Sequence, residues 1–192
     1  MFCREHGWGR VFITKRPTPY PGEPWAFDNG AFRDYSAGKD FNAGAFLRRL
    51  EIAYDVGEPL FAVLPDIIQG GEASLEFSLD WLVKLPPWPW YLAVQDGMGE
   101  GSVEQVIGNV DGLFLGGSDK FKATAGRWRA LAHKHSKRFH YGRAGTPRKI
   151  IHALSMLSDS ADSAFPLWTK ERMKLTAHVL SQKEKQLSLT RD

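Results

Sequence analysis

The chain contains a single cysteine among its 192 residues, Cys3. One thiol cannot form an internal disulfide, and a metal site built from several thiolates is excluded with it. No apolar run approaches the roughly 18 residues that cross a bilayer, and the N-terminal sequence MFCREHGWGR is too polar for a secretory signal. We therefore expect a cytoplasmic protein without a membrane anchor, whose one thiol has no structural role.

Common nucleotide and metal motifs are lacking as well. The sequence has no GxxxxGK[ST], no GxGxxG after a predicted strand, no HExxH and no CxxC. Three histidines, His133, His135 and His140, lie close together in and next to KHSKRFH (134–140), but helical spacing would place the first two on different faces. This segment therefore favours a basic surface over a metal site.

Acidic side chains are scarce in the last third of the chain. Residues 120–192 hold 16 Lys and Arg against 5 Asp and Glu, whereas residues 1–119 hold 9 against 17, and the net charge is +3. A basic segment on an otherwise acidic chain is typical of a surface that faces a polyanion, most commonly nucleic acid. Solvated helix faces would explain the same excess equally well.

Short apolar runs recur along the chain, with helical stretches between them. The runs that indicate strands buried on both faces are VFIT (11–14), LFAVLPD (60–66), WYLAVQD (90–96), GLFLGG (112–117) and RFHYGR (138–143). Helices are expected over 43–55, 72–84, 103–108, 120–136, 147–157 and 169–182, followed by a polar C-terminal tail from about 183. Such alternation predicts an α/β fold with parallel strands and right-handed crossovers.

Several of these strands end in polar or glycine residues, in the sequences FDNG, LPDII, VQDG, LGGS and YGRAG. In a barrel of parallel strands, such ends line the catalytic mouth. Six or seven strands in a chain near the lower size limit of this fold predict a contracted or irregular TIM-like (β/α)8 barrel. No segment resembles a linker, so residues 1–192 are expected to form a single domain.

The remaining candidates for chemistry are carboxylates, an amide and glycines at strand ends, namely Asp28, Asp66, Gln95, Gly116, Gly117 and Asp162. Two carboxylates that flank an anomeric carbon can break a glycosidic bond, because one attacks while the other handles the proton of the leaving group. Carboxylates and amides also suit the hydrogen-bond donors of guanine. A nucleobase attached to C1′ of a sugar meets both descriptions.

At these residues the sequence resembles the tRNA-guanine transglycosylases, and more closely their DNA-modifying relatives, the DpdA-type 7-deazaguanine transglycosylases of phages and genomic islands. FDNGAF is similar to the family's Asp-Ser-Gly-Gly-aromatic motif, and VLPD, AVQDG and FLGGS are similar to its later strand ends, in the same order. FHYGRAGTPRKIIHALSMLSDSADS is similar to its Gly-x-Gly-x-Pro helix and nucleophile strand. The resemblance extends over about residues 28–170.

The resemblance implies a transglycosylase with a covalent intermediate. Asp162 would attack C1′ of a deoxyguanosine and hold the sugar, while Asp28 would protonate the departing guanine and later deprotonate the incoming 7-deazaguanine base. That base would be a co-substrate, and no cofactor is expected. The tRNA enzymes hold a zinc ion through three cysteines and a histidine, and one cysteine cannot supply that module.

The resemblance also implies residues that bind the substrates. The base edge would be read by Asp66 and Gln95, backbone amides would approach the base at Gly116 and Gly117, and stacking would come from Phe32 and Tyr141. Nucleic-acid contacts are expected from the basic residues Arg143, Lys149, Lys170 and Arg172.

The chain departs from the family in ways that favour DNA over tRNA. Ala31 replaces the second glycine of the first motif, VQDG replaces VQGG, and the chain lacks the length of the tRNA enzymes. We therefore expect DNA as the partner, with tRNA as the alternative and companion DNA-modification proteins as possible helpers.

Other interpretations of the same residues stay open. Asp28 could be a turn former and Asp66 a helix cap, Asp96 could replace Gln95, and Asp159 could replace Asp162. Arg143 could contact phosphate or pair with an aspartate. The whole chain could also be a non-catalytic nucleic-acid-binding protein on a barrel scaffold, or a hydrolase or transferase of free nucleosides.

Overall fold

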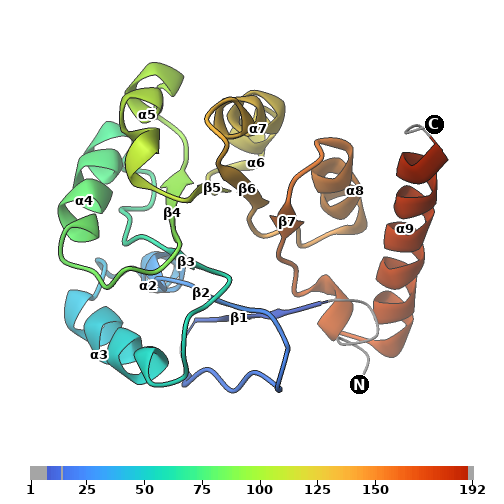
Figure 1. The fold of residues 1–192 in the computed structure, drawn as a ribbon, viewed down its shortest axis with the longest axis horizontal. Helices are drawn as coiled ribbons and strands as arrows, with labels where there is room; N and C mark the ends of the chain where they lie inside the picture. The colour runs from blue at the N-terminus through green and yellow to red at the C-terminus, as the bar shows by residue number, and fades with distance from the viewer. Residues whose placement is uncertain (1–7, 14, 190–192) are drawn as a thin grey trace.

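The structure is a computed structural model that describes residues 8–13 and 15–189, so Cys3 lies outside the described residues. Seven parallel strands form one sheet whose spatial order follows the chain (Figure 1). The strands are β1 (Arg10–Phe12), β2 (Trp25–Phe27), β3 (Phe61–Val63), β4 (Trp90–Val94), β5 (Gly112–Leu115), β6 (Arg138–Tyr141) and β7 (Ser160–Ala161). The predicted α/β alternation and the parallel pairing are confirmed.

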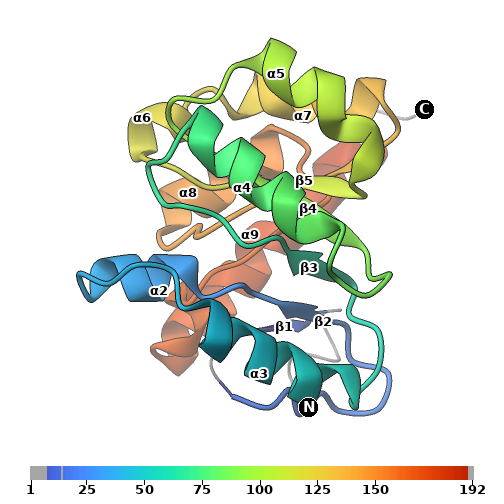
Figure 2. The same ribbon diagram turned by 90° about the vertical axis from the view of Figure 1, so that its left-hand side faces the viewer.

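Helices lie around the outside of the sheet (Figures 1 and 2). They are α2 (Ala31–Ser36), α3 (Ala43–Tyr54), α4 (Glu72–Leu82), α5 (Glu100–Val106), α6 (Asp119–Lys122), α7 (Ala125–Lys134), α8 (Pro147–Ser155) and α9 (Lys170–Leu189). Two 3-10 turns, η1 (Ile107–Asn109) and η2 (Phe165–Leu167), complete the described elements. Among the described residues, no helix combines the length and the apolar character needed to cross a membrane.

The sheet is strongly curled. Neighbouring strands lie about 4.8 Å apart, so three steps across a flat sheet, from β3 to β6, would cover about 14 Å. The ring centroids of Phe61 in β3 and His140 in β6 are nevertheless only 4.7 Å apart. Within residues 8–13 and 15–189, no strand joins β1 to β7. The sheet is therefore an open, parallel half-barrel. Closure into the TIM-like barrel that the sequence predicts is not seen among the described strands.

Alternation along each strand divides the side chains between two buried faces. The convex face packs against the helices, where its fully buried strand residues Leu92, Leu113, Leu115, Phe139 and Tyr141 share a core with helix residues such as Trp128 of α7. The concave face has a smaller cluster of Ala26, Phe61, Val63, Tyr91 and Ala93, with Val11 and Phe114 packed against it. Because both faces are buried, the strands appear in the sequence as continuous apolar runs.

Three helix predictions need correction. The helix expected over 120–136 is two helices, because the chain turns at Ala123 and Thr124, where the Thr124 hydroxyl donates to the carbonyl of Phe121 at 2.6 Å. The helix α2 was not predicted, and it follows Gly30, whose φ of 79° favours glycine. Finally, α9 continues to Leu189 through most of the segment expected to be a tail from 183.

Candidate active site

Asp28 and Asp162 occupy equivalent positions near opposite edges of the half-barrel. Asp28 directly follows β2 and Asp162 directly follows β7. Each lies two residues after a strand residue of the concave face, Ala26 and Ser160, so alternation directs both carboxylates to that face. The charge of Asp162 acts on Asp28 and contributes to the raised pKa of that carboxyl. The fold thus brings the two predicted catalytic residues within electrostatic reach.

Asp28 has surroundings that favour its protonated form. Burial is the main cause of its raised pKa, and repulsion from Asp162 adds to the increase. The backbone N–H of Gly30 donates to Asp28 Oδ1 at 2.7 Å, which partly opposes the shift. This contact is also an Asx-type turn, so the carboxyl that was expected to act as the acid does form the local turn.

Arg49 of α3 holds the backbone around Asp28 and was not singled out from the sequence. Its Nη2 donates to the carbonyl of Asn29 at 2.6 Å and its Nη1 to that of Asp28 at 3.4 Å. A Cβ at Gly30 would lie 2.8 Å from Arg49 Nη2, a second reason for glycine at that position. The guanidinium therefore fixes the turn that carries the candidate acid.

Asp162 has surroundings that favour the carboxylate. Burial alone would raise its pKa, but the hydrogen bond and charge of His140, the N–H of Arg143 and the charge of Lys122 outweigh burial and lower the pKa. His140 Nε2 lies 3.1 Å from Asp162 Oδ1, and the backbone N–H of Arg143 donates to the same oxygen at 2.8 Å. Two carboxyls of one kind therefore have pKa values shifted in opposite directions.

His140 is a candidate site residue that the sequence prediction missed. The KHSKRFH segment was interpreted as a basic surface, yet His140 is only 2 % exposed, between the rings of Phe61 at 4.7 Å and Phe114 at 4.8 Å. Its Nδ1 lies 2.8 Å from Ser160 Oγ, so the Ser160 hydroxyl can donate to Nδ1 while the proton on Nε2 is donated to Asp162. Strand alternation could have identified it, because the side chain of His140 points to the opposite face of the sheet from that of its neighbour Phe139.

The other two histidines do form surface pairs. His133 Nε2 lies 2.9 Å from Asp159 Oδ2, and His135 Nε2 lies 2.8 Å from Glu104 Oε1. Asp159 also accepts from the N–H of Phe139 at 2.7 Å, which fastens it at the amino end of β7. Of the two acidic candidates in this segment, only Asp162 is therefore at the carboxyl end of the strand.

Asp66 belongs to a buried polar network behind the two catalytic candidates. It is 5 % exposed, and burial, with a contribution from the charge of Asp28, raises its pKa to about 7. Asn29 Nδ2 donates to Asp66 Oδ1 at 2.7 Å, and Gln95 Nε2 donates to Asp66 Oδ2 at 3.1 Å. Each carboxyl oxygen keeps a second lone pair, so Asp66 can still accept a hydrogen bond from a base.

The role predicted for Gln95 as a reader of the base edge is not supported by its contacts. Its Oε1 accepts from the N–H of Gln69 at 2.6 Å, and its Nε2 contacts Asp66, the carbonyl of Ile67 and Ser74 Oγ at 3.0 to 3.1 Å. An amide with both ends engaged and 2 % exposure positions Asp66 instead. Asp96, the alternative, accepts from Ser118 N at 2.7 Å and Ser118 Oγ at 2.6 Å and holds that loop.

Phe32 and Arg143 meet across the carboxyl end of the half-barrel. Phe32 follows β2 on α2 and is 42 % exposed, and the guanidinium carbon of Arg143 lies 3.7 Å from its ring centroid. Arg143 follows β6 with a φ of 53°, a strained value for a side chain with a Cβ, and its Nη2 donates to the carbonyl of Gly117 at 3.2 Å. The guanidinium thus covers one face of Phe32 at the distance of a stacked planar group.

The two predicted glycines differ in what requires them. Gly117 has a φ of 73°, and a Cβ there would lie 2.6 Å from Asp96 Oδ2, so its own loop demands glycine. A Cβ at Gly116 would meet only the carbonyl of Val94, at 3.4 Å. Protein packing leaves space beside Gly116, which is compatible with the predicted approach of a base.

Tyr141 is a correction to the prediction. Alternation places it with Phe139 on the convex face, where it is 2 % exposed within the helix-packed core. Its hydroxyl lies 3.3 Å from His152 Nδ1 on α8, and Lys122 Nζ lies 5.3 Å from its ring centroid. A side chain packed on that face cannot stack on a base held at the concave face.

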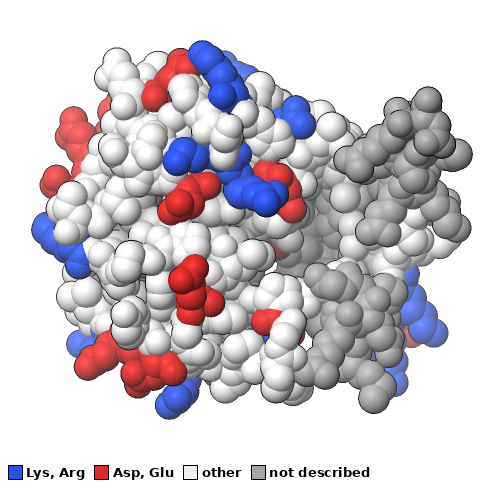
Figure 3. All heavy atoms as spheres, in the orientation of Figure 1, with Lys and Arg blue, Asp and Glu red and all other residues white. Residues whose placement is uncertain are grey.

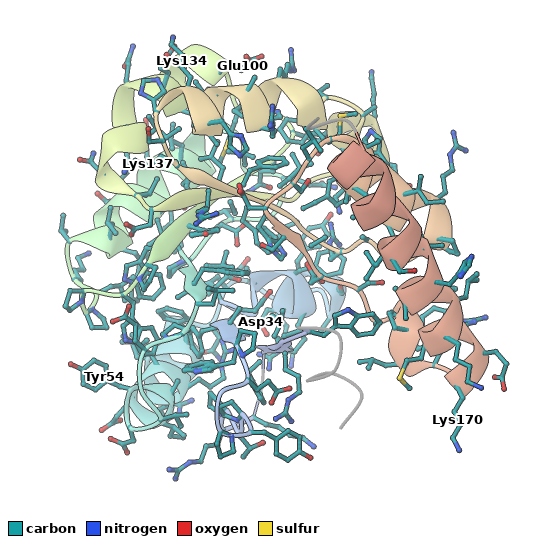
Figure 4. The ribbon with its side chains drawn as sticks, turned by 45° about the vertical axis from the view of Figure 1, so that its right-hand side comes forward. Asp34, Tyr54, Glu100, Lys134, Lys137 and Lys170 are labelled. Carbon is teal, nitrogen blue, oxygen red and sulfur yellow. The ribbon has the colours of Figure 1, made fainter. Side chains whose placement is uncertain are left out.

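The predicted nucleic-acid contacts are dispersed. Lys149 Nζ forms an ion pair with Asp119 at 2.6 Å, and Arg172 stacks on Phe165 and Trp168. Lys170 lies at the start of α9 and points outward (Figure 4). On the face seen in Figure 3, basic and acidic side chains are interspersed rather than gathered by sign.

Within the described part of the chain, no three His, Cys, Asp or Glu side chains come together in a way that could hold a metal ion. A scan against protein-family models finds no matching family, and a search of curated proteins finds no match. The geometry of the site and the resemblance of its motifs are therefore the features that point to a function.

Proposed function

We propose that the protein is a transglycosylase that exchanges guanine in DNA for a 7-deazaguanine base through a covalent aspartyl-sugar intermediate. The observation that carries the proposal is the placement of two carboxyls at the ends of β2 and β7, where Asp28 accepts from the N–H of Gly30 and Asp162 contacts His140 and accepts from the N–H of Arg143. These surroundings raise the pKa of Asp28 and lower that of Asp162. Pairs of carboxyls whose surroundings separate their pKa values divide the acid and the nucleophile roles between them. Double-displacement glycosyl transfer needs one of each.

The first half of the reaction breaks the bond from C1′ to the purine nitrogen. We assign the attack on C1′ to Asp162 Oδ2, because Oδ1 already accepts from His140 and from the N–H of Arg143. The electron pair of the breaking bond goes to the purine, and the proton held by Asp28 goes to the same leaving group. Asp28 is then a carboxylate and Asp162 an ester of the sugar.

The second half reverses these steps with a different base. Asp28 takes the proton from the ring nitrogen of the incoming 7-deazaguanine, that nitrogen attacks C1′, and the ester bond to Asp162 breaks. Asp28 ends protonated and Asp162 ends as a carboxylate, so the enzyme is restored without an external oxidant or reductant. The hydrogen bonds from His140 and Arg143 lower the basicity of Asp162, which makes it a better leaving group.

The neighbouring side chains supply contacts for the base. Phe32 offers a half-exposed ring, and a base that enters would displace the Arg143 guanidinium from it, which frees that cation for a phosphate. Asp66 would accept from the base edge, with Asn29 and Gln95 fixing its orientation. Stacking of about 1 to 3 kcal/mol would offset much of the cost of extracting the base.

The test is base exchange by Asp162→Asn beside wild type, with Asp159→Asn as the matched control in the same segment. We expect wild type and the control to incorporate a labelled 7-deazaguanine into DNA and to form an adduct with DNA that survives denaturation, and Asp162→Asn to do neither. Exchange by the Asn variant at the wild-type rate would refute the mechanism. Parallel incubations with tRNA distinguish the alternative polymer, and DNA bound without exchange by any variant would indicate a non-catalytic binding protein.

A further inference from the structure

An aromatic surface next to the nucleophile strand plays no part in the proposed chemistry. The turn η2 begins three residues after β7, and large apolar side chains are exposed at its end, with Leu167 73 % and the next residue, Trp168, 61 % exposed. Phe165 is 9 % exposed, and its ring centroid lies 6.3 Å from that of Trp168. Phe165 anchors the turn in the core while Trp168 presents its indole outward.

The side chain of Arg172 contacts both aromatic rings, Phe165 and Trp168. The guanidinium carbon of Arg172 lies 4.7 Å from the ring centroid of Trp168 and 5.0 Å from that of Phe165. The N–H of Arg172 also donates to Thr169 Oγ1 at 3.2 Å in the first turn of α9. The indole is therefore held by contacts on one side rather than left to rotate freely.

We infer that Trp168 and Arg172 form a stacking platform for a single-stranded nucleotide that flanks the one in the active site. Aromatic rings beside cations are the combination that binds single strands without sequence preference, because every base has a face to stack and every nucleotide a phosphate. Lys170 and Lys174 lie within two residues of Arg172 in the first turns of α9, and the one acidic residue among them is Glu171. A polyanion complements this charge.

The platform is within reach of the active site. Trp168 is six positions after Asp162 in the chain, so their backbones lie no more than about 20 Å apart, or about six nucleotide steps at the duplex spacing of about 3.4 Å. A strand whose target base is extracted at Asp162 can therefore pass over the indole. The flanking role rests on the proposed function, whereas binding of a single strand by the platform does not.

The experiment measures binding of a fluorescein-labelled 12-nucleotide single strand by anisotropy, in the full chain carrying Asp162→Asn so that no turnover occurs. We expect Trp168→Ala to weaken binding about 5- to 150-fold and Trp168→Phe to retain most of it, because a phenyl ring still stacks. Val83→Ala, which alters an 83 % exposed side chain at the C-cap of α4, serves as the matched control and should bind unchanged. Arg172→Gln should reduce the slope of log affinity against log salt by about 0.7.

Two results would overturn the inference. One is binding by Trp168→Ala, with an unchanged thermal unfolding midpoint, as tight as that of the parent. The other is no binding of the strand by the parent, as expected if the surface contacts a protein instead. If Trp168→Ala weakens binding but wild type exchanges no base in DNA, the platform stands and the proposed function falls, so the two failures are distinguishable.

Discussion

The ends of β2 and β7 present the same side chain in opposite surroundings. Asp28 is enclosed by apolar burial and a neighbouring negative charge, and its pKa is raised. Burial also acts to raise the pKa of Asp162, whose side chain is 25 % exposed, yet an imidazole, a backbone N–H and the Lys122 ammonium lower that pKa. The difference teaches that burial alone does not decide the charge of a carboxyl, because donors within hydrogen-bond distance decide it.

Removing the proton of Asp28 is expected to have the largest effect. In Asp28→Asn the amide oxygen can still accept from Gly30, so the turn persists, but no proton is available for the leaving base. Loss of general acid catalysis predicts a fall of about 10²- to 10⁴-fold in the single-turnover release of guanine. The exposed Asp40→Asn is the control. A decrease smaller than tenfold would mean that another group supplies the proton.

Asp66 sharpens the comparison, because its pKa of about 7 is raised although it has two amide donors. Because the pKa of Asp66 is higher in the folded state than the unfolded value near 3.9, its protonation contributes to stability. This contribution to the free energy of unfolding is fully present below about pH 4 and is lost as the pH rises through about 7. The free energy of unfolding should fall by up to about 4 kcal/mol across that window. Urea unfolding at several pH values should show a larger fall in wild type and in Asp80→Asn, an exposed control, than in Asp66→Asn, where only the raised pKa of Asp28 still contributes a fall of this sign.

His140 is the residue whose replacement should make Asp162 resemble Asp28. His140→Phe fills the space between Phe61 and Phe114 without a donor, whereas His140→Gln keeps an N–H for Asp162. A hydrogen bond to a charged group contributes about 1.5 to 3 kcal/mol, so the Phe variant should lose about 10- to 150-fold in kcat/KM. Its acid limb should also move to higher pH. An acid limb shared by wild type and His140→Phe would contradict the role of the imidazole.

The smallest effect is expected at the aromatic residues. Phe32→Ala should weaken binding of the free base by about 1 to 3 kcal/mol, because the half-exposed ring at the mouth is lost. Tyr141→Phe removes only a hydroxyl that contacts His152 on the convex face. Isothermal titration with the base should therefore separate the two variants. If Tyr141→Phe lost as much affinity for the base as Phe32→Ala, Tyr141 would have to contact the base.

Much of the fold could be predicted from the sequence, because strands buried on both faces leave continuous apolar runs and polar residues follow where they end. The local pattern could not predict how far the sheet curls, since the contact of Phe61 with His140 joins residues far apart in the chain. The break between α6 and α7 was missed because the turn at Thr124 interrupts an otherwise uniform helical pattern.

At the candidate site, the prediction placed Asp28 and Asp162 at strand ends, where the structure has them. It failed where neighbouring residues in one strand had to be assigned to faces. Phe139 and Tyr141 lie on the convex face, and His140 lies on the concave face. Strand alternation would therefore have assigned the histidine to the site and the tyrosine to the core. The satisfied amide of Gln95 depends on Gln69 and Ser74, which no spacing rule connects to it.

The open seam between β1 and β7 has a mechanical consequence. A closed barrel fixes the distance between opposite strand ends through an unbroken ring of hydrogen bonds, whereas in this protein that ring is interrupted in the described chain. The separation of Asp28 after β2 and Asp162 after β7 therefore depends on the curvature of the sheet. A molecule that bridged the seam would fix that curvature, and with it the separation of the two carboxyls, without touching either of them.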